Sequence, residues 1–165
     1  VFDHPGRVAY ACLSPRTDAR VLDELCAEID YEAVTFAATD HEDVPVYHTN
    51  VVLSIGTAFA LVCAESVPPT QRSALLERLA SGGRRVVTID RRQMGSYAGN
   101  VLELRATDGA RVLAASSCAM SSLPEDTRGA LEACVERVVA APVPTIERFG
   151  GGSVRCMLAE VFLPR

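Results

Sequence analysis

The sequence has 165 residues, the size of one ordinary domain, and 48% of them are hydrophobic, so it can bury a core and is not intrinsically disordered. Its net charge of −5 and its aromatic content of 5% argue against a nucleic-acid binder, because neither a basic track nor a base-stacking platform is present. No apolar run is long enough to span a membrane, and the first residues lack the basic start and apolar stretch of a signal peptide.

The first predicted elements form a partial repeat unit. A short strand-like piece covers 1–3, and 8–13 reads as a buried strand. A helix with one apolar face follows Pro15, and 31–38 returns as a strand. A polar connection then leads to the segment that contains His48.

Two later stretches share one pattern, at a period of roughly fifty residues. Their predicted elements are strands over 51–55, 59–63 and 85–90 with a helix from about 70, and strands over 101–104, 111–116 and 143–147 with a helix capped by Ser122 and Glu125. Two arginine pairs flank one strand, Arg84-Arg85 and Arg91-Arg92, and they are predicted to be surface charges.

The predicted fold class is therefore α/β, built from repeated ββαβ units. The units cover approximately 1–38, 50–90 and 100–147, and 157–163 is predicted as an opening strand whose unit is not completed. An array that begins late in one unit and stops early in another suggests a closed ring that has been cut open, or half of one.

The repeat places three polar side chains in the same register. Aligning the opening strands puts Asn50, Asn100 and Cys156 at equivalent positions. The equivalent ends of inner strands converge in a radial array, so we expect these side chains to face one pocket. His48 lies two residues before Asn50, so both point to the same side of an extended segment.

Cys156 follows three consecutive glycines and stands next to Arg155, whose cation favours a thiolate. A cysteine with a distant histidine is a nucleophile-and-base pair, so Cys156 and His48 are candidate catalytic residues. The alternative is a glycine-rich turn before a core strand with a buried thiol. Asn100 is open to two interpretations: it hydrogen-bonds a substrate, or it closes a turn after Gly99.

The six cysteines include no C-x-x-C pair, and no histidine stands at zinc-finger spacing. We therefore expect a reduced, cytoplasmic protein with mostly structural thiols and no metal site.

Three motifs in this order resemble the guanidino-group-modifying superfamily, which contains arginine deiminases, dimethylarginine hydrolases and amidinotransferases. They are Tyr47–Val51, Tyr97–Leu104 and Gly150–Glu160. Within the superfamily the chain is most similar to citrulline-utilisation hydrolases. The resemblance implies a five-bladed α/β propeller, of which this chain is the C-terminal half, since members of the superfamily are roughly twice as long.

The resemblance also implies a mechanism without a cofactor. Cys156 attacks the central carbon of a guanidino or ureido group, ammonia leaves, and water hydrolyses the thio-intermediate. His48 is the general acid and base. Asn50 and Asn100, which we expect at the same pocket, are the candidate substrate-binding residues. Arginine deiminases carry aspartate where this chain has Asn50, and an amide suits a neutral ureido group, so citrulline is the expected substrate.

The sequence leaves other functions open. One alternative is an amidinotransferase, in which an amine resolves the intermediate, or an arginine-deiminase-type enzyme. A non-catalytic fragment is the alternative of another class, as is a half that acts only after self-association or assembly with a missing N-terminal half. A thiol redox protein is less well supported, because no second cysteine stands near Cys156 in the sequence.

Overall fold

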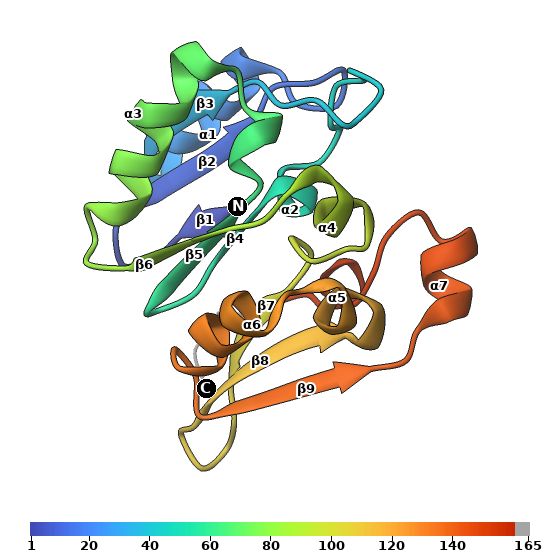
Figure 1. Ribbon diagram of the computed structural model, residues 1–165. Helices are drawn as coiled ribbons and strands as arrows, with labels where there is room; N and C mark the ends of the chain where they lie inside the picture. The colour runs from blue at the N-terminus through green and yellow to red at the C-terminus, as the bar shows by residue number, and fades with distance from the viewer. Residues whose placement is uncertain (161–165) are drawn as a thin grey trace.

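The computed structural model describes residues 1–160, which form three small mixed sheets with helices between their strands (Figure 1). In each sheet the first two strands are antiparallel, and the second and third are parallel. A tight connection suffices for the antiparallel pair, whereas the parallel pair needs a crossover, which a helix supplies. The predicted ββαβ pattern is therefore present three times.

The first unit contains β1 (Phe2–Asp3), β2 (Val8–Cys12), α1 (Ala19–Ile29) and β3 (Glu32–Phe36). Its opening strand β1 is only two residues long and pairs antiparallel with β2. The side chain of Asp18 caps α1 by accepting from the backbone N–H of Arg20, and the helix ends where Asp30 adopts a left-handed conformation.

The second unit contains α2 (Thr49–Val52), β4 (Leu53–Ile55), β5 (Phe59–Val62), η1 (Ala64–Ser66), α3 (Pro69–Ala80) and β6 (Arg85–Thr88), and α4 (Arg91–Gly95) follows it. The strand predicted over 51–55 is wrong in its first half, because α2 makes one helical turn there. The Thr49 hydroxyl accepts from the Cys12 N–H at 2.9 Å, and the Val51 N–H donates to the His48 carbonyl at 3.1 Å. These bonds turn the chain before strand pairing begins.

The third unit contains β7 (Leu102–Arg105), β8 (Arg111–Ser116), α5 (Ser117–Ser122), α6 (Glu125–Glu132) and β9 (Arg137–Ala141), and α7 (Pro144–Phe149) and η2 (Arg155–Met157) follow it. The strand predicted over 143–147 is wrong, because β9 ends before it and Pro144 occupies the first turn of α7. The predicted cap is also wrong: the Ser122 hydroxyl donates to the Ala119 carbonyl, and α5 and α6 replace one helix.

The core lies around the middle strands of the units. Every residue of β2 and β5 is buried, as expected for strands whose two faces are both covered. Arg84 is half-buried, with a side chain only 9% exposed, contrary to the prediction of a surface charge, because its guanidinium forms a bidentate ion pair with the buried Asp3 at 2.6 and 2.8 Å. This ion pair joins the first unit to the second.

The strand predicted over 157–163 is not seen in the part that the structure describes. Met157 belongs to η2, residues 158–160 have no regular structure, and 161–163 lie outside the described residues. The three sheets remain separate within residues 1–160, so no ring of sheets closes in this part of the chain.

Candidate active site

Cys156 lies in η2, after the glycine loop that follows α7, rather than at the mouth of a buried strand. Gly151 takes a left-handed conformation with φ of +70°, which glycine adopts without strain. The buried Ser153 anchors the loop by donating from its hydroxyl to the Glu147 carboxylate at 2.8 Å. The Cys156 N–H then donates to the Ser153 carbonyl at 3.1 Å, and the thiol is exposed.

The structure brings together the three side chains that the repeat places in register. The amide Nδ2 of Asn100 lies 3.2 Å from the Cys156 sulfur, and Nδ2 of Asn50 lies 3.8 Å from it. The expected convergence of Asn50, Asn100 and Cys156 is therefore present in the geometry, although no strand carries Cys156. Two neutral N–H donors next to one sulfur stabilise its anionic form.

Local backbone geometry holds the two asparagines. Asn100 ends a turn in which its N–H donates to the Tyr97 carbonyl at 2.9 Å, and Tyr97 is left-handed with φ of +65°. Gly99 packs so closely on the Val51 carbonyl oxygen that no β-carbon fits. The Asn100 amide then donates to the Asn50 carbonyl at 3.1 Å, which joins this turn to α2.

His48 stands at the N-terminal end of α2 and is exposed. Its ring lies edge-on to the Tyr47 ring, 4.5 Å between centroids, and the Tyr47 hydroxyl donates to the Gly151 carbonyl at 2.8 Å. Within residues 1–160 the His48 side chain makes no hydrogen bond to Cys156. The structure thus places His48 beside the loop of Cys156 without joining the two side chains directly.

Arg155 does not direct its guanidinium to the neighbouring thiol. Its Nη1 donates to the Ser54 hydroxyl at 3.0 Å and to the Val101 carbonyl at 3.1 Å, and burial lowers the pKa of this guanidinium. Ser54 itself donates to the Val101 carbonyl at 2.6 Å. Arg155 therefore ties the loop to β4 and to the start of the third unit, a role that its position in the sequence does not reveal.

A pocket of about 330 Å³ opens beside α2. Its polar lining includes His48, Asn50, Arg155 and Glu160. The Oδ1 atom of Asn50 is buried and has no hydrogen-bond partner within the described residues. A buried acceptor without a partner is costly, so this oxygen is ready to accept an N–H from a bound molecule. Glu160 was not predicted, because a single carboxylate within an apolar stretch carries no signal.

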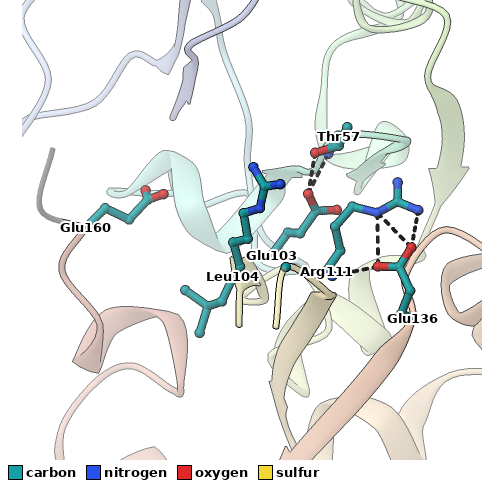
Figure 2. A pocket seen from close by; sticks show the side chains of 8 residues that line it. Thr57, Glu103, Leu104, Arg111, Glu136 and Glu160 are labelled. Carbon is teal, nitrogen blue, oxygen red and sulfur yellow. Dashed lines mark hydrogen bonds and ion pairs between the residues drawn. The ribbon is translucent and has the colours of Figure 1, made fainter. Parts of the chain in front are cut away.

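A second, larger pocket of about 640 Å³ lies where β7 meets the second unit (Figure 2). Glu103 accepts from the Thr57 hydroxyl at 2.5 Å, and Arg111 forms an ion pair with Glu136 at 2.6 Å. Glu160 lines both pockets, so they are neighbours. Among the described residues, neither a cysteine nor a histidine lines the second pocket.

Within residues 1–160 no three His, Cys, Asp or Glu side chains are grouped to hold a metal ion. None of the helices in the same range is both long and apolar enough to cross a membrane.

Comparison with known proteins identifies the family. Residues 1–163 match the family profile described as N,N dimethylarginine dimethylhydrolase, eukaryotic. No curated protein matches the sequence significantly.

The fold resembles solved structures of two proteins. The N-terminal domain of ArgZ, an arginine dihydrolase from the ornithine–ammonia cycle in cyanobacteria, was solved with its substrate and superposes with a TM-score of 0.70 at 15% identity. This alignment covers 94% of the present chain and 52% of that domain, so the chain spans about half its length. AgrE with L-arginine aligns with a TM-score of 0.73 at 14% identity, over 95% of this chain and 21% of AgrE. AgrE with ornithine and NAD⁺ aligns with a TM-score of 0.73 at 15% identity, over 100% of this chain and 22% of AgrE.

Proposed function

The chain belongs to the eukaryotic N,N-dimethylarginine dimethylhydrolase family, and from this premise we propose that it carries the nucleophile of a hydrolase of guanidino or ureido C–N bonds. One observation supports the proposal above all: the exposed Cys156 sulfur lies beside the amides of Asn50 and Asn100. These residues come from three separate parts of the chain. Solved relatives in complex with substrate or with L-arginine agree with a substrate of this class.

In the proposed reaction the Cys156 thiolate attacks the central carbon of the substrate and forms a C–S bond. The tetrahedral adduct collapses, the C–N bond breaks, and ammonia leaves with a proton. Water then attacks the thio-intermediate, the C–S bond breaks, and the thiolate returns. We assign the proton transfers in both halves to His48, because its pocket is shared with Asn50 and an imidazole exchanges protons near neutral pH.

We further propose citrulline as the preferred substrate. The unpartnered Oδ1 of Asn50 is an acceptor for a substrate N–H, and the amide as a whole is neutral. A guanidinium cation would be better matched by a carboxylate at this position, whereas a ureido group is uncharged. The relatives that bind arginine make arginine the alternative substrate.

We propose that the chain forms one domain, the C-terminal part of a five-bladed α/β propeller. Three ββαβ units and a length of about half the ArgZ N-terminal domain support this assignment. The remaining part of the propeller, or a second copy of the chain, would complete the site. All six cysteines are free, which supports a reducing compartment such as the cytoplasm.

Ammonia release from citrulline and from arginine tests the proposal, with Cys156→Ala as the control. Release from citrulline that depends on Cys156 is the expected result. An added acceptor amine separates hydrolysis from amidino transfer, because only a transferase would form a new guanidino product. Absence of release from the chain alone and from an N-terminally extended form would contradict the enzymatic function.

A further inference from the structure

Asn100 is 2% exposed, so its side chain belongs to the packed interior rather than to the pocket surface. A side-chain amide has two N–H donors and one carbonyl acceptor. One N–H of the Asn100 Nδ2 donates to the Asn50 carbonyl at 3.1 Å. The other donates to the Cys156 sulfur at 3.2 Å. Both donors are therefore committed to the protein, and neither is free to bind a substrate.

The orientation of this amide is fixed by its neighbour. A backbone carbonyl only accepts hydrogen bonds, so the Asn50 carbonyl requires the Nδ2 side of Asn100 to face it. The same nitrogen is then the one held next to the sulfur. The opposite atom, Oδ1, lies 3.6 Å from the sulfur and accepts from the neutral thiol.

From these contacts we infer that Asn100 is a positioning residue for Cys156 and not a substrate-binding residue. One N–H of the Asn100 amide donates to the Cys156 thiolate. The other donates to the Asn50 carbonyl and so holds α2 next to the same sulfur. The inference deepens the proposed function, since it assigns a role within that site.

The test uses the thiol itself and needs no substrate. Alkylation of Cys156 by iodoacetamide at neutral pH is measured by mass spectrometry in the wild type and in Asn100→Asp, which keeps the shape of the amide but removes both donors. Loss of a hydrogen bond to a charged group should slow alkylation about tenfold. The ultraviolet absorbance of the thiolate should fall in parallel, which a purely structural role would not cause.

The control is Gln71→Glu, the same amide-to-carboxylate change at an exposed position where the side-chain oxygen accepts from the Ala37 N–H. It should leave Cys156 alkylation unchanged. Alkylation of Asn100→Asp at the wild-type rate would overturn the inference.

A measurement on the wild type covers the case in which Asn100→Asp does not fold. Proton–nitrogen spectra resolve the side-chain amides of Asn50 and Asn100, the only two asparagines in the sequence. Alkylation of Cys156 should shift the Asn100 amide signals, and an unshifted pair would overturn the inference. Neither readout involves catalysis, so the two tests are independent. A failed alkylation or amide measurement overturns the role of Asn100, whereas a failed ammonia assay overturns the proposed function.

Discussion

Cys156 packs directly against Gly152: a β-carbon added at Gly152 would lie 2.8 Å from the Cys156 sulfur and 2.9 Å from its β-carbon. Both distances are below van der Waals contact, so the loop must keep glycine at this position for the thiol to stay where it is. Two of the three glycines before Cys156 thus have a local purpose: Gly151 takes a left-handed backbone conformation, and Gly152 leaves room for the Cys156 side chain.

Gly152→Ala should displace the Cys156 side chain and lower hydrolase activity about a hundredfold, since a shift of about 1 Å in a reacting group has that effect. Ammonia release measures the loss, and the thermal midpoint of each variant shows whether it is folded. Gly129→Ala is the control, because an added β-carbon meets nothing there. Equal activity of the two variants would contradict the packing argument.

Arg84→Met should destabilise the fold by about 3–5 kcal/mol, because removing one partner leaves the Asp3 carboxylate buried and uncompensated. Urea denaturation measures the free energy of unfolding. The double variant with Asp3→Asn should recover part of the loss, and additive losses in the double variant would show that the pair is not coupled.

The pH dependence of stability should contain a contribution from Glu136. The Arg111 guanidinium and backbone N–H lower the pKa of this carboxyl from 4.5 to about 2. A lowered pKa means that the stabilisation is complete above the ordinary pKa and is lost as the pH falls toward 2. Thermal midpoints of Glu136→Gln should therefore depend less on pH than those of the wild type in that window, and parallel curves would contradict the assignment.

The order of thiol alkylation should follow exposure. Cys156 and Cys118 are exposed, and the other four cysteines are buried. Partial burial, with the Glu147 charge, raises the pKa of Cys118, and burial raises the pKa of Cys12 and Cys63. Mass spectrometry should find Cys156 labelled first and Cys118 second; labelling of Cys118 ahead of Cys156 would contradict an activated nucleophile.

Asn50→Asp should increase the rate with arginine relative to that with citrulline about tenfold or more, because a carboxylate forms an ion pair with a guanidinium cation but not with a neutral ureido group. Ammonia release from each substrate gives the ratio. The substitution leaves the Asn100 contacts in place, since the Asn100 amide donates to the Asn50 backbone carbonyl and to the Cys156 sulfur and not to the Asn50 side chain. An unchanged ratio would remove Asn50 from the specificity argument.

The sequence by itself determined the repeated strand–strand–helix–strand pattern, because alternation of apolar residues and the spacing of turns are local properties. It also predicted that Asn50, Asn100 and Cys156 converge, although from opening strands that are absent at Asn50 and Cys156 in the described residues. It did not determine where β9 lies, since Val138 and Val139 suit a helix face as well as a strand, and only parallel pairing with β8 decides between them.

Only the tertiary structure decided the roles of two arginines and of Asn100. Arg84 reads as surface charge until Asp3, from another sheet, is found beside it. Arg155 is adjacent to Cys156 in the sequence, but its guanidinium donates to the Ser54 hydroxyl and the Val101 carbonyl. Asn100 donates both of its amide N–H groups to protein atoms. Hydrogen bonds between residues about fifty positions apart cannot be predicted from the sequence, because they depend on how the units pack.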